Sequence, residues 1–338
     1  MQNKKTTVVL IQSYFLYIFM LIVISAITIN NVFAQPPQKV INDITEVTND
    51  SIFTTLRKDG TIYNLKENIT LPAGKDMTYV DTTKDGKVVV ATSSGENQTF
   101  IFNTIDNSLI AKIKVGDVPK GIKISPNQNY VFVANELPGT VSIINFENLS
   151  IIKEIPVGKV PHNIVFSPDG LKGYVTVQGE DKIVVIDTDS LEIINEIQDS
   201  KGPHNLDITN DGKLLFVANA ASNDVAIVNT TSFEILKKIP VSLGHHGIDV
   251  SPDNKRVYVS GIGSDKVNVI DAEKQQLVKQ ITVGIGPHGI RTSSNGNYLF
   301  VDVTTTNEIV VIDTNSLEII SRIPTGNVPF WMAVSGNN

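Results

Sequence analysis

Four of the five histidines in this 338-residue chain recur at one position of a repeat. They lie 42 residues apart, at His162, His204, His246 and His288, and His245 precedes the third of them. Neutral imidazole is a good ligand for zinc and copper, and the chain has no cysteine to compete with it. If these side chains converge, they predict a Zn(II) or Cu(II) site. Clustered imidazoles also titrate near neutrality, so an anion-binding or pH-responsive site is a second interpretation.

Duplication of one ancestral repeat would produce the same column of histidines without any metal. The residues that follow the histidines test this idea, and they are Asn163, Asn205, Gly247 and Gly289. These neighbours differ while histidine stays, which weighs slightly against simple copying. We therefore keep the metal site as a hypothesis beside the duplication reading.

A second column lies three residues after the histidines and carries charges. Its members are Asp81, Lys123, Val165, Asp207, Asp249, Arg291 and Ala333. Asp207 and Asp249 are the candidates for a catalytic base, or for carboxylates that orient the imidazoles. The simpler alternative is a solvated wall with local ion pairs.

Other repeats place different residues in the histidine column. Lys120 and Phe330 stand there, and Trp331, the only tryptophan, follows Phe330. These three residues are weaker candidates for a ligand pocket, with the aromatic rings as walls for a sugar or another planar group. The alternative is that the rings only pack the last repeat against its neighbours.

The spacing that aligns these columns is a 42-residue repeat. Its landmarks fall at Met77, Pro119, Pro161, Pro203, His245, Pro287 and Pro329. A period of this length indicates a solenoid, a propeller or an array. Each repeat holds short β-rich segments separated by turn residues, which predicts four strands per unit. In the repeat that begins at Pro161 the strands are expected at 163–167, 173–177, 182–186 and 193–197.

The two ends of the chain predict how the array closes. The last repeat contains only one strand, at 330–334, and the N-terminal part supplies three more, at 51–55, 61–65 and 68–72. Joining them completes a seventh unit and leaves no open edge. The sequence therefore predicts an all-β, seven-bladed β-propeller of four-stranded blades, closed by N-terminal strands that pair with the C-terminal strand.

The N-terminal segment is expected to direct export. Residues 1–34 combine a basic start, a long apolar run and a Val32-Phe33-Ala34 cleavage pattern, which is typical of a signal peptide. The alternative is an uncleaved membrane anchor, which would be the chain's only link to a membrane. Residues 35–44 are predicted to be a linker and 45–338 a single propeller domain. We therefore expect an extracytoplasmic protein, either secreted or held at the cell surface.

Composition excludes some functions and leaves others open. The formal net charge is −7 and there is no basic cluster beyond the N-terminus, so no nucleic-acid partner is expected. Five Asn-X-Ser/Thr patterns, which also arise by chance in a β protein rich in Asn and Thr, are potential glycosylation sites at Asn49, Asn68, Asn97, Asn148 and Asn229. The chain lacks the GxSxG, HExxH and P-loop patterns, so no enzyme class is indicated by a motif.

The repeat resembles the YVTN-repeat β-propellers, a family of lactonase-like, extracytoplasmic, seven-bladed propellers. Residues 173–177 read GYVTV, with Val177 where the family has asparagine, while Asn135 and Asn219 keep that asparagine. The resemblance covers about residues 74–338. It implies the fold but no single activity, because related propellers include lactonase-like enzymes, cofactor-bearing dehydrogenase subunits and surface-layer modules.

The leading functional prediction is a binding or scaffold module of the cell envelope, with a His-lined metal site at the mouth of the central channel. Its partner would be an envelope protein, a glycan, or a small ligand in the channel. The first alternative is a metal-dependent enzyme of the lactonase or lyase type, with the histidines as metal ligands and Asp207 or Asp249 as the base. The second is an accessory subunit of an envelope redox enzyme.

Overall fold

The computed structural model describes residues 44, 48–198 and 200–336, which belong to a unit that spans Ile41–Asn338. The predicted signal peptide and nearly all of the predicted linker lie outside the described residues. Among the helices in the described part of the chain, none has the length and apolar character needed to cross a membrane.

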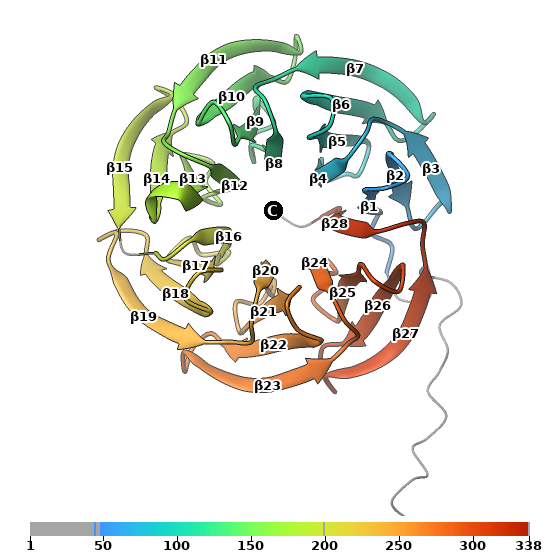
Figure 1. Ribbon diagram of the computed structural model, residues 1–338, viewed down its shortest axis with the longest axis vertical. Coiled ribbons are helices and arrows are strands. Elements are labelled where there is room, and N and C mark those ends of the chain that lie inside the picture. The colour runs from blue at the N-terminus through green and yellow to red at the C-terminus, as the bar shows by residue number, and fades with distance from the viewer. Residues whose placement is uncertain (1–43, 45–47, 199, 337–338) are drawn as a thin grey trace, which may run out of the picture. The chain divides into compact units, whose positions relative to one another are not determined.

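Seven four-stranded antiparallel sheets are arranged in a ring around a central channel (Figure 1). The predicted all-β, seven-bladed propeller is therefore confirmed. The innermost strands are β4 (Met77–Thr82), β8 (Pro119–Ile124), β12 (Pro161–Phe166), β16 (Pro203–Ile208), β20 (His245–Val250), β24 (Pro287–Thr292) and β28 (Pro329–Val334). The second strands are β5 (Val88–Ser93), β9 (Tyr130–Asn135), β13 (Lys172–Val177), β17 (Leu214–Asn219), β21 (Arg256–Gly261), β25 (Tyr298–Val303) and β1 (Ile52–Leu56).

The two outer positions of each blade complete the sheets. The third strands are β6 (Gln98–Asn103), β10 (Thr140–Asn145), β14 (Lys182–Asp187), β18 (Asp224–Asn229), β22 (Lys266–Asp271), β26 (Glu308–Asp313) and β2 (Thr61–Asn64). The outermost strands are β7 (Ser108–Lys114), β11 (Ser150–Pro156), β15 (Glu192–Gln198), β19 (Ile235–Pro240), β23 (Gln276–Thr282), β27 (Glu318–Pro324) and β3 (Ile69–Pro72). A short 3₁₀ helix, η2 (Gln178–Glu180), follows β13.

The hydrophobic core lies between neighbouring blades. One aromatic ring in the second strand of five successive blades is fully buried, and these rings are Phe132, Tyr174, Phe216, Tyr258 and Phe300. The second and third strands are buried on both faces, which explains why they read as continuous Val- and Ile-rich runs. These aromatic and β-branched side chains are buried against the next blade, and their packing fixes the distance between neighbouring blades.

The predicted closure is confirmed in the seventh blade, in which β28, β1, β2 and β3 pair in that order. Phe53 faces Ala333 and Thr54 faces Met332 across the β1–β28 pair. The Thr54 hydroxyl also hydrogen-bonds to the buried carboxyl group of Asp302 in blade 6, at 3.0 Å. Burial raises the pKa of Asp302 well above its ordinary value. The two ends of the chain thus close the ring and contact the preceding blade.

A β-bulge interrupts each inner strand at the position of the histidine column. In blade 3, Pro161 pairs with Val177 and Ile164 pairs with Val175, so two residues oppose one. The register of the inner pair shifts at the corresponding place in the other six blades. A bulge re-aims the side chains that it contains. The repeat therefore directs two successive side chains per blade toward the channel.

A hydroxyl group in the second strand satisfies the bulge and links it to the next blade. The Thr176 hydroxyl accepts a hydrogen bond from the Asn163 amide at 2.9 Å and donates one to the His204 carbonyl at 2.9 Å. Thr92 makes the equivalent bridge between blades 1 and 2, with the Tyr79 amide and the Lys120 carbonyl. These hydroxyl groups tie neighbouring inner strands together.

Replacement of Thr176 by valine is expected to lower the free energy of unfolding by about 1–3 kcal/mol, because a buried amide and a buried carbonyl lose their partner. The measurement is urea unfolding followed by circular dichroism. Thr176→Ser is the matched control, since serine keeps the hydroxyl group and the same position in blade 5 is Ser260. Equal losses for the valine and serine variants would contradict the proposed bridge.

Candidate functional site

The side chains of the inner strands differ in chemistry between the two ends of the channel. We call the region of the histidine column the His end and the region of the charged column the Asp end. The two columns lie three positions apart along each inner strand, which is at most about 10 Å of extended chain. The side chains that lie between them decide whether the two ends communicate.

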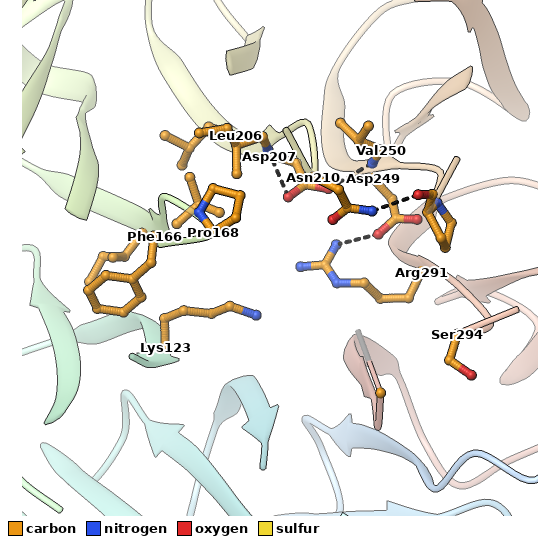
Figure 2. Close-up of a pocket in the computed structure, with 15 residues that line it drawn as sticks. Lys123, Phe166, Pro168, Leu206, Asp207, Asn210, Asp249, Val250, Arg291 and Ser294 are labelled. Atoms are coloured by element: carbon orange, nitrogen blue, oxygen red, sulfur yellow. Dashed lines mark hydrogen bonds and ion pairs between the residues drawn. The ribbon is translucent and has the colours of Figure 1, made fainter. Parts of the chain in front are cut away.

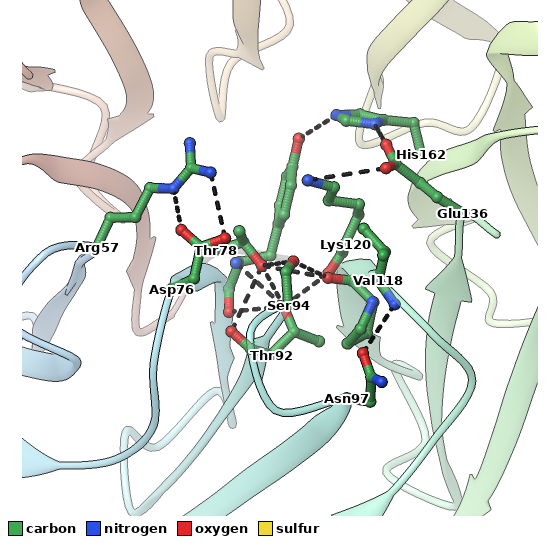
Figure 3. A network of polar contacts seen from close by, with 12 residues as sticks. Arg57, Asp76, Thr78, Thr92, Ser94, Asn97, Val118, Lys120, Glu136 and His162 are labelled. Carbon is green, nitrogen blue, oxygen red and sulfur yellow. Dashed lines mark hydrogen bonds and ion pairs between the residues drawn. The ribbon is translucent and has the colours of Figure 1, made fainter.

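At the His end, His162 is buried and both of its ring nitrogens are engaged (Figure 3). Its Nδ1 lies 3.0 Å from a carboxylate oxygen of Glu136, and its Nε2 lies 2.8 Å from the Tyr79 hydroxyl. The Lys120 ammonium group lies 3.8 Å from the same carboxylate. The four groups form one connected chain from the mouth of the channel to its centre.

Burial favours the neutral form of His162 and lowers its pKa, although Glu136 opposes this effect. Burial acts to raise the pKa of Glu136, but the hydrogen bond from His162 and the nearby positive charges outweigh it, so the pKa is lowered. The lowered pKa of the buried His162 favours a neutral imidazole, and the lowered pKa of Glu136 favours an ionised carboxylate beside it. His162 therefore donates through Nδ1 to Glu136 and accepts the Tyr79 hydroxyl proton through Nε2.

The other described histidines are also held by hydrogen bonds and ring contacts. The His204 ring lies 3.8 Å from that of His162, and its Nδ1 contacts the Asn205 amide at 2.8 Å. His288 donates from Nδ1 to the Phe330 carbonyl at 2.6 Å and stacks on the Phe330 ring at 3.9 Å. The rings of His162 and His204 thus lie against each other across neighbouring blades.

The structure leaves the metal hypothesis as a prediction. Within residues 48–198 and 200–336, no group of three or more His, Asp or Glu side chains is arranged to hold a metal ion. The side chains of His245 and His246 lie outside this description. His162 would have to give up its bond to Tyr79 or to Glu136 before it could bind a metal.

Two aromatic side chains pack against each other in the layer after the histidine column. The Tyr79 and Trp331 rings lie 4.5 Å apart, and both side chains are buried. They occupy the repeat position directly after the histidine column, at which Gly289 stands in blade 6. A Cβ atom on Gly289 would lie only 2.9 Å from the Trp331 Cα, so glycine allows the two inner strands to approach. We call Tyr79 and Trp331 the aromatic plug.

Trp331 therefore packs in the interior rather than walling an open pocket. The ligand-pocket call on Lys120, Phe330 and Trp331 stays a prediction. Phe330 lies above it, half-buried, with the Arg57 guanidinium 4.9 Å from its ring. Arg57 in turn pairs with Asp76 at 2.5 Å, which also places a charged pair at the His end.

At the Asp end, the inner strands surround a cavity of about 240 Å³ (Figure 2). Asp207, Asp249, Arg291 and Lys123 line it, and Arg291 also lies 5.0 Å from the Trp331 ring. Blade 3 and the start of blade 4 supply an apolar wall, which consists of Ile164, Val165, Phe166, Pro168, Leu206 and Ile208. The cavity is therefore charged on one side and apolar on the other.

The two carboxylates of the cavity hold neighbouring inner strands together. Asp207 accepts the Val250 amide at 2.7 Å, and Asp249 accepts the Thr292 amide at 2.8 Å, each from the next blade. Asp81 makes the same contact with the Ile124 amide. In the described part of the chain, their partners are backbone amides and Arg291, so a role of Asp207 or Asp249 in orienting the histidines stays a prediction.

Burial raises the pKa of both Asp207 and Asp249. For Asp249 the pKa reaches about 7, because burial outweighs the nearby Arg291 charge and the Asp207 charge adds to it. For Asp207, burial raises the pKa against the opposing charges of Arg291 and Lys123. Two interacting carboxyl groups titrate as a pair, so at neutral pH this pair carries part of one proton.

Sequence reasoning missed two residues of the channel. Tyr79 stands in the column of Asn163 and Asn205, where Trp331 is the only other large residue, and its size is the signal that could have found it. Glu136 follows the second strand of its blade, at the His end of the channel. Its signal was weak, because the same column holds Ser94, Gln178, Ala220, Ile262 and Thr304.

Comparison with protein-family models gives two matches. Residues 72–234 match the model of the lactonase seven-bladed β-propellers, and residues 209–330 match that of the cytochrome D1 haem domain. Together with the seven observed blades, these matches show a seven-bladed β-propeller that resembles the lactonase propellers. No curated protein matches the sequence.

Solved structures share the fold at low sequence identity. A chain of the Kuenenia stuttgartiensis hydrazine synthase is 20% identical over 76% of this chain and 89% of its own, with a TM-score of 0.68. A protein of unknown function from Desulfotomaculum acetoxidans is 19% identical over 85% and 99%, with a TM-score of 0.74. The dihydro-haem d1 dehydrogenase NirN is 17% identical over 85% and 75%, with a TM-score of 0.64. These likenesses establish the fold alone.

Proposed function

We propose that this protein is an extracytoplasmic binding module that holds a small ligand in the cavity at the Asp end of its channel. The observation that carries the proposal is the cavity itself, which combines about 240 Å³ of space with buried charged groups and an apolar wall. Ligand sites combine apolar surface with a few convergent polar groups in this way. The predicted signal peptide supports a location outside the cytoplasm.

The size of the cavity limits the ligand. Pockets for drug-sized ligands measure about 300–1,000 Å³, and this cavity is smaller. A ligand of metabolite size therefore fits, whereas a polymer chain would contact the cavity only through its end. An envelope protein or glycan remains a partner for the outer surfaces of the propeller rather than for the channel.

Trp331 supplies the test, because it is the only tryptophan and Arg291 lies over its ring. A ligand that contacts Arg291 is expected to change the tryptophan fluorescence in a saturable way. A panel of small acids, amides, alcohols and sugars would be titrated into the mature protein. Failure of every compound to change either the fluorescence or the melting temperature would contradict the proposal.

An acid–base enzyme is the second candidate, and the Asp207–Asp249 pair favours it. A carboxyl group with a pKa near 7 can take up and release a proton at neutral pH, as a general base must. The proposed chemistry is the lactonase or lyase type predicted from the sequence. Asp249 would take a proton from a substrate bound in the cavity. Asp249→Asn would abolish a measured turnover, and an unchanged turnover would remove Asp249 from the mechanism.

Both ring nitrogens of His162 are engaged. A metal at the His end would therefore either bind through His204, His246 and His288 alone or require His162 to break one of its hydrogen bonds. Elemental analysis of the untagged mature protein tests this directly, beside a variant with His162, His204, His246 and His288 changed to alanine. Near-stoichiometric zinc or copper that is lost in the variant would support the site. If neither protein holds metal after incubation with metal and dialysis, the metal site is contradicted, and the histidines have only packing and hydrogen-bonding roles.

Haem is the group implied by the second family model and by the NirN match. The described residues do not fit it. Both nitrogens of His162 are engaged, and the side chains of His162, His204 and His288 are buried. The cavity at the Asp end is too small for a tetrapyrrole. The accessory-subunit hypothesis stays a proposal that rests on the resemblance to propellers of redox enzymes, since no contact among the described residues supports it.

A further inference from the structure

We infer that the Asp-end cavity is selective for small monocarboxylates with a short apolar tail, with the carboxylate held between Arg291 and Lys123. This inference rests on the proposed function, since it names the ligand class of the same cavity. It follows from the unused hydrogen-bonding capacity of the two cations and from the placement of the apolar wall.

Arg291 has hydrogen-bond donors to spare. A guanidinium group carries five N–H donors. In the part of the chain that the structure describes, Nη1 donates to the carbonyls of Ile248 and Ile290, at 3.0 and 2.8 Å, and lies 3.7 Å from Asp249. The structure records no protein partner there for Nη2 or Nε. These remaining donors form an edge suited to a carboxylate.

Lys123 faces Arg291 from the other side of the cavity. Both side chains point toward the open middle of the cavity in Figure 2, from blade 2 and blade 6. The Lys123 ammonium group contacts Asp81 at 3.0 Å and is largely buried, and among the described residues this contact uses one of its three donors. A carboxylate placed between the two cations would receive charge-assisted hydrogen bonds from both.

The apolar wall explains why the ligand should be an organic acid rather than a bare ion. Ile164, Phe166 and Leu206 line the side of the cavity that belongs to blades 3 and 4. A short alkyl or aryl group against this wall would bury apolar surface, at roughly 25 cal/mol for each Å² removed from water. An inorganic anion would gain nothing from these side chains.

Asp207 and Asp249 also line the cavity and would repel an anion if both were ionised. The raised pKa of each carboxyl group limits this repulsion, because the pair keeps part of one proton at neutral pH. The other charged or titratable groups around Asp249 are Arg291, Lys123 with its partner Asp81, and Tyr258 on the second strand of the same blade. Monocarboxylate affinity should therefore fall as the pH rises through about 7.

The experiment compares each acid with its neutral amide, which has nearly the same shape. Butyrate with butyramide, and benzoate with benzamide, would be titrated into the mature protein by isothermal calorimetry at pH 6 and pH 8. The expected result is saturable binding of the acids, tighter at pH 6, with the amides at least about tenfold weaker. Arg291→Gln should weaken acid binding about ten- to hundredfold, as loss of a charge-assisted hydrogen bond predicts.

Two further variants keep the outcome decisive. Lys123→Gln tests the second cation independently in case Arg291→Gln does not fold, and Arg322→Gln is the matched control, because Arg322 pairs with Glu308 on the outer part of blade 6. Equal binding of acids and amides would overturn the carboxylate inference but leave the proposed binding function standing. Acid binding that survives both cavity variants would also overturn the inference. Failure of all four probes would overturn the inference, and the proposed function would fall with it only if the wider panel of acids, amides, alcohols and sugars also failed.

Discussion

Replacement of Trp331 by alanine is expected to destabilise the propeller by about 3–5 kcal/mol, the range measured for truncation of large buried aromatic residues. Trp331 is buried in the strand that closes the ring, and it contacts Tyr79 at 4.5 Å and Arg291 at 5.0 Å. Its loss would open a void between the two ends of the channel. Thermal and urea unfolding followed by circular dichroism would measure the effect.

Trp331→Phe is the matched variant, because it keeps an aromatic ring in the plug and should cost clearly less than the alanine substitution. Trp331 also lies in β28, the strand that closes the ring of blades by pairing with β1. A loss of stability below about 1 kcal/mol for Trp331→Ala would mean that the aromatic plug does not stabilise the propeller. It would also contradict the division of the channel into a His end and an Asp end.

Replacement of Asp249 by asparagine is expected to make the protein more stable at pH 8 by roughly 1–3 kcal/mol, and by progressively less as the pH falls toward 5. Burial raises the pKa of Asp249 to about 7 in the folded protein, well above its value in the unfolded chain. Between these two values the folded state binds more protons than the unfolded state. The contribution of this group to stability is therefore complete below about pH 4 and is lost as the pH rises through 7.

Asparagine keeps the oxygen that accepts the Thr292 amide, so the variant removes the charge and leaves the strand contact. The measurement is urea unfolding at pH 5, 6, 7 and 8. Asp211→Asn is a control of opposite sign, because hydrogen bonding from Thr209 lowers the pKa of Asp211 to about 2 and its carboxylate stabilises the fold above pH 4. A stability difference for Asp249→Asn that does not change with pH would contradict the buried, proton-holding pair.

The fold was predictable because the repeat encodes it redundantly. Turn residues, strand patterns and the large residue of the second strand return every 42 residues, and each copy supports the same assignment. The seventh blade was the harder case, since its strands come from both ends of the chain. The structure places them at Ile52–Leu56, Thr61–Asn64, Ile69–Pro72 and Pro329–Val334, within a residue of the predicted bounds.

The site was predictable only in part, because column membership tells which residues share a layer but not which way they turn. The bulge in each inner strand places the histidines in one layer and puts Tyr79 and Trp331 in the next. The pairing of His162 with Glu136 and Tyr79 depends on contacts between different blades, which a repeat pattern cannot give. The cavity at the Asp end likewise depends on how far Arg291 and Lys123 reach into the channel.

The most direct test of the central claim is a crystal structure of the mature protein grown with benzoate. The account predicts the carboxylate between the Arg291 guanidinium and the Lys123 ammonium groups, with the ring against Ile164, Phe166 and Leu206. A well-ordered cavity that holds only water at saturating benzoate, or benzoate bound on the outer surface alone, would contradict it.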